Sequence, residues 1–118
     1  MSKQEIKLLT KIIRELSLYM LMHGYRKFSL TTEYGQSETR FLLKVQGLEE
    51  SLKNHIKEKV NREREIEVET YGWELVGDVD SHSELEILGL LVDYVEISED
   101  GEDTVLTFVR KSMYKEKK

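Results

Sequence analysis

The sequence predicts an α+β fold, namely a two-layer α/β sandwich in which an antiparallel or mixed sheet of about four strands is covered on one face by helices. A long N-terminal stretch has the apolar spacing of a helix, and two pairs of segments alternate as the strands of hairpins do. The 118 residues, 39% of them hydrophobic, are enough for one core and too few for two domains. We therefore expect one domain over residues 1–110 and a charged tail over residues 111–118.

The first helix is predicted at about residues 3–23. Ser2 and Glu5 have the spacing of a capping box, in which each side chain accepts a hydrogen bond from the other residue's backbone N–H. Gly24 is the expected C-cap, and His23 is expected in the last turn, where the helix dipole favours it. The apolar stripe steps by three and four: Ile6, Leu9, Ile13, Leu16 and Met20.

Two hairpins are predicted from period-two alternation. The first joins residues 27–34 to residues 39–45 through a turn at residues 35–37, and Gly47 ends it. The second joins residues 94–98 to residues 104–110 through a turn at Asp100 and Gly101. The expected inward residues are Phe28, Leu30, Thr32, Tyr34, Phe41, Leu43, Val45, Leu106 and Phe108.

Between the hairpins, a charged surface helix is predicted from the four-residue spacing of Leu48, Leu52, Ile56 and Val60. Residues 62–76 fit either a strand or a continuation of this helix, and we favour the helix because the charge density continues. Residues 77–82 are predicted to form a polar loop. Ser81 and Glu84 then offer a second capping box before a short helix, which carries Leu85, Leu88 and Val92.

Composition excludes several classes of function. A net charge of −5 argues against general nucleic-acid binding, which needs a basic face. The absence of cysteine excludes disulfides and thiolate chemistry and is compatible with the cytoplasm. The three histidines lack the spacing of a metal site, so no metal is expected. Charged residues interrupt the N-terminal apolar run, so neither a signal peptide nor a membrane span is expected.

Residues 15–25 begin with Glu15 and end in the corner His23-Gly24-Tyr25. This segment resembles the first conserved box of histidine-kinase-like (GHKL) ATPase domains, and it is most similar to the anti-sigma factor serine kinases. Residues 88–107 resemble the last helix and closing hairpin of the same domains. The resemblance implies the histidine-kinase-like ATPase fold and, in an intact member, binding of ATP with Mg²⁺.

The ligand positions that the resemblance implies are substituted here. Tyr19 stands in place of the asparagine that holds Mg²⁺, and Val45, two residues before Gly47, stands in place of the aspartate that binds adenine. The glycine-rich phosphate segment corresponds to a stretch that contains His82 and Glu84, and its carboxylate repels phosphate. A hydrogen bond to a charged group contributes roughly 1.5–3 kcal/mol, so the adenine ligand alone is worth about ten- to a hundredfold in affinity.

Three functions follow from this resemblance. We favour a non-catalytic regulatory or protein-binding domain without cofactor, whose charged helical insert docks a protein partner or a second copy. Tyr71 and Trp73 are then candidate binding residues, although burial explains them equally well. The first alternative is a divergent serine kinase that uses ATP and Mg²⁺, with Glu15 as the base. In the favoured interpretation, Glu15 is instead solvated or paired with Arg14 or Lys11. The second alternative is a small-molecule sensor that uses the vacated pocket.

Overall fold

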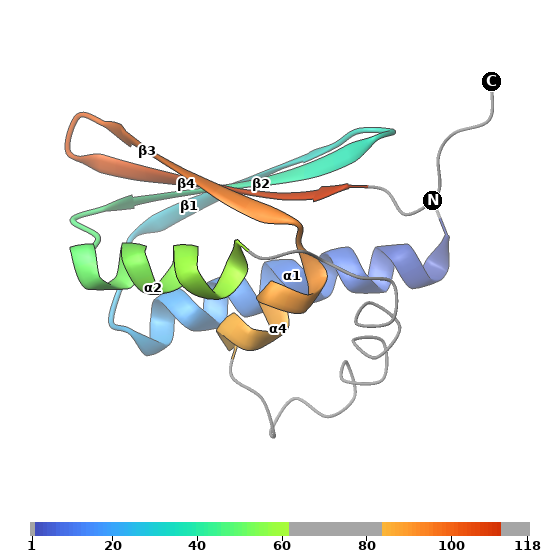
Figure 1. Ribbon diagram of the computed structural model, residues 1–118, viewed down its shortest axis with the longest axis horizontal. Coiled ribbons are helices and arrows are strands. Elements are labelled where there is room, and N and C mark those ends of the chain that lie inside the picture. Colours follow the sequence, from blue (N-terminus) through green and yellow to red (C-terminus); the bar gives the residue numbers. More distant parts are fainter. Residues whose placement is uncertain (1, 62–83, 112–118) are drawn as a thin grey trace.

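The computed structural model describes residues 2–61 and 84–111 (Figure 1). Within these ranges the chain begins with α1, passes through a hairpin and α2, and ends with α4 and a second hairpin. The elements are α1 (Lys3–Met22), β1 (Phe28–Tyr34), β2 (Glu38–Gln46), α2 (Glu50–Val60), α4 (Glu84–Leu91), β3 (Tyr94–Asp100) and β4 (Asp103–Lys111).

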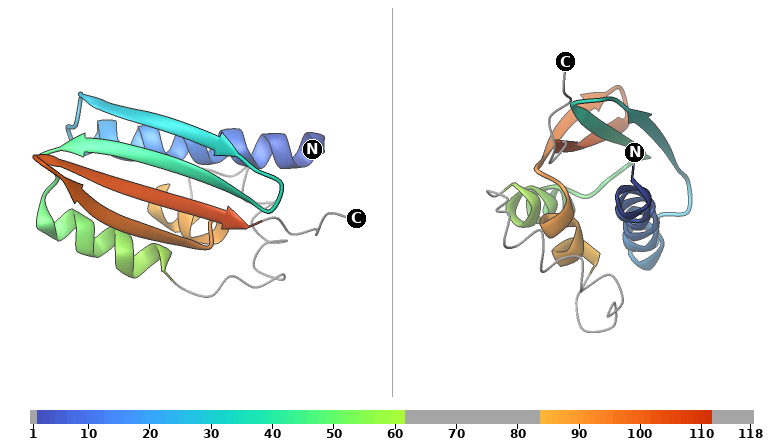
Figure 2. Two further views of the ribbon diagram at one scale, coloured as in Figure 1. Left: turned by 90° about the horizontal axis from the view of Figure 1, so that it is seen from above. Right: turned by 90° about the vertical axis from the view of Figure 1, so that its right-hand side faces the viewer.

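The strands form one sheet in the order β1-β2-β4-β3, and each neighbouring pair is antiparallel. The helices lie against one face of this sheet, with α1 on the side of β1 and β2 and with α2 beneath β3 (Figure 2). The predicted two-layer α/β sandwich is therefore confirmed.

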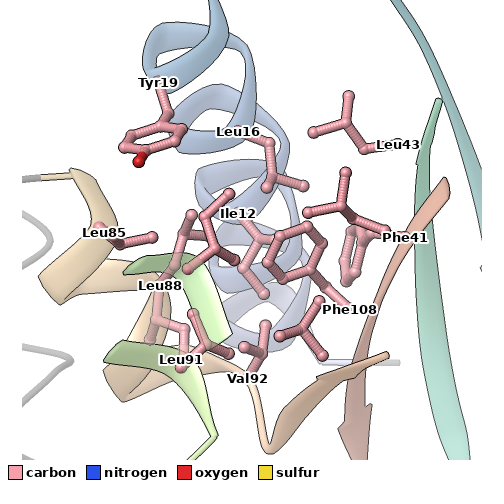
Figure 3. Close-up of a cluster of buried hydrophobic side chains, with 14 of the residues drawn as sticks. Ile12, Leu16, Tyr19, Phe41, Leu43, Leu85, Leu88, Leu91, Val92 and Phe108 are labelled. Atoms are coloured by element: carbon pink, nitrogen blue, oxygen red, sulfur yellow. The ribbon is translucent and has the colours of Figure 1, made fainter. Parts of the chain in front are cut away.

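The core fills the space between the sheet and the helices. Phe41 of β2 lies opposite Phe108 of β4, and both rings are buried. Ile12 and Leu16 of α1 point into the same cluster, as Figure 3 shows. The inward residues of β2 and β4 agree with the sequence prediction, because alternate residues of a strand face the same layer. Tyr34, at the end of β1, is the exception and is half exposed.

Both ends of α1 are capped. Ser2 Oγ accepts a hydrogen bond from the Glu5 N–H at 3.0 Å, as predicted. At the other end the Tyr25 N–H donates to the Met20 carbonyl at 2.9 Å and Gly24 has a φ of +86°, which together make a Schellman motif.

The predicted capping box at Ser2 is wrong in its second half. The Glu5 carboxylate binds Arg110, whose Nε and Nη2 donate to its two oxygens at 3.2 Å each. Arg110 is 1% exposed, and its Nη1 also donates to the Leu91 carbonyl at 2.7 Å. A tertiary partner has therefore taken the carboxylate that the local motif assigned to Ser2. This arginine joins the start of α1, the end of α4 and β4.

Helix α2 follows the predicted seam, with Ile56 and Val60 buried. Two contacts fasten it to the edge strand β3. Asn61 Oδ1 accepts a hydrogen bond from the Val95 N–H at 2.7 Å, and Lys53 Nζ lies 2.8 Å from the Glu99 carboxylate. The first of these contacts satisfies a backbone donor that an edge strand otherwise leaves unpaired.

In the second hairpin, the loop and the end of the last strand each lie one residue later than predicted. Asp100 pairs with Asp103, so the loop of the second hairpin consists of Gly101 and Glu102 and not of Asp100 and Gly101. Gly101 has a φ of +67°, which a two-residue hairpin loop with glycine at its first central position requires. Strand β4 also includes Lys111, which was assigned to the tail. The predictions for residues 62–83 and 112–118 lie outside the described residues.

Candidate functional site

The resemblance directs attention to the face of α1 that carries Glu15 and Tyr19. The two residues are one helical turn apart, and both are buried. In Figure 3 the Tyr19 ring lies on the side of α1 that faces α4, near Leu85. The structure therefore brings together the two α1 residues that the sequence singled out, and it places them in the interior.

Glu15 is held by a charged partner. Its carboxylate lies 2.6 Å from the Nζ of Lys11, one turn earlier on α1. Lys11 is 5% exposed and Glu15 is 2% exposed, whereas Arg14 between them faces solvent. Of the two interpretations open at the sequence level, pairing with Lys11 is the observed one.

The surroundings of this pair are poor in hydrogen bonds. Within the part of the chain that the structure describes, neither Lys11 Nζ nor the paired carboxylate oxygen of Glu15 has a hydrogen bond of good geometry. An ammonium group has three donors and a carboxylate about four acceptor positions, so these two atoms leave donor and acceptor capacity unused. Buried polar groups are normally satisfied, and exceptions need a structural or functional explanation. Among the described residues, the Lys11–Glu15 pair is therefore a polar feature that needs such an explanation.

His23 lies four residues after Tyr19, on the same side of α1 and directly after its last residue. Its Nδ1 lies 2.9 Å from the Tyr19 carbonyl oxygen, and the rings of Tyr19 and His23 lie 4.3 Å apart. A carbonyl only accepts, so Nδ1 carries the proton and donates it. His23 is thus the C-cap residue of α1, a role that was predicted from the sequence for Gly24, which follows it.

The other positions implied by the resemblance divide into two groups. Val45 is buried in β2 on the helix side of the sheet, and Gly47 ends the strand with a φ of +72°. Glu84 is the first residue of α4, and its side chain lies outside the described part. His82, Tyr71 and Trp73 also lie outside it.

Sequence reasoning missed Lys11 as a site residue. Its spacing of four from Glu15 was visible, and so was the line formed with Tyr19 and His23, each four residues further. Residues four apart lie on one helix face, so this spacing was the available signal. Spacing alone does not predict the burial of this pair, because lysine and glutamate are rarely buried.

A second feature lies at one end of the sheet. An open depression of about 550 Å³ is formed where β1 begins and β2 ends. Its lining mixes both charges: Lys27, Phe28, Ser29, Lys44, Gln46, Glu102 and Asp103. The acidic and basic groups partly neutralise one another, since Lys44 Nζ lies 3.7 Å from the Asp103 carboxylate.

In residues 2–61 and 84–111, no three acidic or histidine side chains lie close enough together to hold a metal ion. Among the described helices, none combines the length and the apolar character that a membrane crossing requires.

Comparison with known proteins gives no relative. No family model, no curated protein and no solved structure matches this chain.

Proposed function

We propose that this chain is a cytoplasmic, non-catalytic regulatory or protein-binding domain with a histidine-kinase-like ATPase fold, from which the nucleotide ligands have been lost. The order helix, hairpin, helix, then helix and hairpin supports the proposal, because the resemblance implies that order. The antiparallel sheet covered on one face by helices supports it as well.

The observation that carries the proposal is the Lys11–Glu15 pair. A general base must reach the proton that it abstracts, directly or through one water molecule. Glu15 is 2% exposed, and its carboxylate lies 2.6 Å from the Lys11 ammonium group, so it faces a buried cation and not a site open to a substrate. Under the proposal, the one residue that keeps the kinase identity serves structure and not phosphoryl transfer.

The residues at the positions of two other nucleotide ligands, Tyr19 and Val45, also support a loss of ATP binding. Tyr19 presents a ring and a phenol where the resemblance implies an amide ligand for Mg²⁺. Val45 is buried among apolar residues and offers no acceptor to an adenine amino group. ATP recognition depends on the metal ligand, the adenine acceptor and the phosphate cradle together, so their loss removes most of the binding free energy.

Calorimetric titration of the full chain with ATP and Mg²⁺ tests the proposal. We expect no binding up to millimolar nucleotide, and a dissociation constant in the micromolar to millimolar range would establish the kinase alternative. The Lys11→Met variant is the matched comparison, with its fold checked by circular dichroism. If this variant binds ATP and the natural chain does not, the site is masked by Lys11 and not lost, and the proposal is wrong.

A further inference from the structure

Strand β1 is an edge of the sheet that no described helix or strand covers. The other edge, β3, is fastened to α2 through Asn61 and Lys53. Strand β1 has no neighbouring strand on its outer side among the described residues. The chain contains no proline, and the β1–β2 register runs without a bulge from Phe28 to Tyr34. Natural proteins usually protect such an edge, because its free N–H and C=O groups bind other strands.

The hydrogen-bond pattern identifies which groups of β1 are free. The Gly35 N–H donates to the Glu38 carbonyl at 3.0 Å, so these two residues form a hydrogen-bonded pair. Such pairs alternate along an antiparallel ladder, so Glu33, Thr31 and Ser29 use their backbone groups toward β2. The N–H and C=O groups of the residues between them, which include Leu30 and Thr32, therefore point outward from the sheet edge.

The side chains of β1 are complementary to those of a second, antiparallel β1 strand. If β1 meets a second β1 in antiparallel orientation with Leu30 opposite Leu30, then Lys27 lies opposite Glu33 on both sides of the two-fold axis. Lys27 and Glu33 are exposed and form no ion pair among the described residues. In the same register, Ser29 lies opposite Thr31, two small hydroxyl side chains that pair well across strands.

Neighbouring registers lack this complementarity. Moving the axis to Thr31 puts Ser29 opposite Glu33 and leaves Lys27 opposite Gly35, so both ion pairs are lost. Moving it to Ser29 puts Lys27 opposite Thr31 and also leaves Glu33 without an opposite charge. Opposite charges stabilise cross-strand pairs, so the register centred on Leu30 is favoured.

Helix α1 offers a second contact on the same side. Ile6 is 47% exposed and Ile13 is only partly buried. A helix turns about 100° per residue, which places both side chains more than about 100° around the axis from Tyr19, on the flank away from α4. That flank lies on the side of β1 (Figure 2). A second copy joined at β1 brings its own α1 toward these isoleucines.

We infer that two copies of this chain associate through antiparallel pairing of their β1 strands, with Leu30 on the two-fold axis and Lys27 of each copy paired with Glu33 of the other. The two sheets then form one continuous sheet of eight strands, counting four described strands in each copy. Such an interface is isologous, because the same strand serves both copies. The inference does not depend on whether the nucleotide site is lost.

Sedimentation of the full chain over a range of concentrations, with charge-exchanged variants, tests this pairing. We expect the natural chain to dimerise in the micromolar range. Lys27→Glu or Glu33→Lys alone turns two attractions into two repulsions and should raise the dissociation constant about tenfold, equivalent to about 1.4 kcal/mol. The double variant K27E/E33K exchanges the charges and should restore the dimer. The control is Glu96→Lys on β3, the other edge of the sheet. It changes the charge as Glu33→Lys does and should leave the dissociation constant unchanged.

Introduced cysteines test the register, because the chain has none of its own. Mixing the single variants Ser29→Cys and Thr31→Cys under oxidation should give a disulfide between the two, whereas each variant alone should stay uncrosslinked. A crosslink in Thr31→Cys alone would show that the two-fold axis lies at Thr31, and it would overturn the proposed ion pairs. A monomer at all concentrations, or a dimer that the charge variants leave unchanged, would overturn the interface itself.

Discussion

The buried pair of Lys11 and Glu15 gives the sharpest test of how α1 works. Glu15→Gln removes the carboxylate charge and leaves the Lys11 ammonium buried beside a neutral amide. With side chains only 4% and 3% exposed and an N–O distance of 2.6 Å, neither charge has solvent to replace its partner. Breaking a buried pair from one side costs about 3–5 kcal/mol, so we expect a loss of that size, and a similar loss for Lys11→Met.

Replacing both partners at once has a different expected result. In Lys11→Met combined with Glu15→Leu, no charge remains buried at these two positions and the volume is nearly kept. Such replacements of an ion pair by apolar groups are often neutral or stabilising by about 1–4 kcal/mol. The scarcity of hydrogen bonds around this pair favours that outcome, because desolvation of the two charges is incompletely offset.

Urea unfolding followed by circular dichroism measures these differences. With a urea dependence of about 2 kcal/mol per molar, the single variants should unfold about 2 M earlier than the natural chain. Arg14→Gln, an exposed change on the same helix, is the control and should stay within about 0.5 kcal/mol. Single variants that lose less than about 1 kcal/mol would show that water reaches the pair, and the structural role given to Glu15 would then be refuted.

Three further outcomes follow from individual contacts. Arg110→Met should cost about 2–4 kcal/mol in urea unfolding, because it leaves a carboxylate and a carbonyl without their buried donor. An unchanged unfolding midpoint would contradict this. Asn61→Ala should lose about 1–2 kcal/mol by freeing an N–H of the edge strand, and hydrogen exchange should speed up there first. The hydrogen bond from Lys53 holds the pKa of the Glu99 carboxyl below its ordinary value of 4.5. Since this pKa is lowered on folding, the stabilisation is present above the ordinary value and lost as pH falls through the folded value. An NMR titration should show the low pKa, and Lys53→Met should raise it.

The elements with a strong period were predictable from sequence. The stripe of α1 and the alternation of β2 depend only on local spacing, so their positions agree with the structure to within one residue. The reciprocal half of the capping box was not predictable, because Glu5 binds an arginine that is 105 residues away in the chain. A local motif therefore predicts one possible hydrogen-bond partner of a side chain, and the tertiary structure can supply another.

The burial of Lys11 at the candidate site was likewise not predictable from local spacing. The stripe of α1 placed Lys11 and Glu15 on a flank that is solvated in most surface helices. That flank is buried here, on the side of α1 that faces α4, and the position of α4 depends on the packing of the whole helical layer. The line of residues four apart was visible from the start, but only the packing shows that its charged members leave solvent.

The proposed loss of nucleotide binding does not depend on a single residue. Removing Lys11 would free the Glu15 carboxylate, yet Tyr19 would still occupy the position implied for the metal ligand, and Val45 would still offer no acceptor. Each of these side chains is now part of the buried core, so restoring a polar ligand at either position would place an unpaired polar group in an apolar layer. Packing therefore opposes the return of the ligands, and this is why we interpret the helical face of this sandwich as structural and look to its edge strand for interaction.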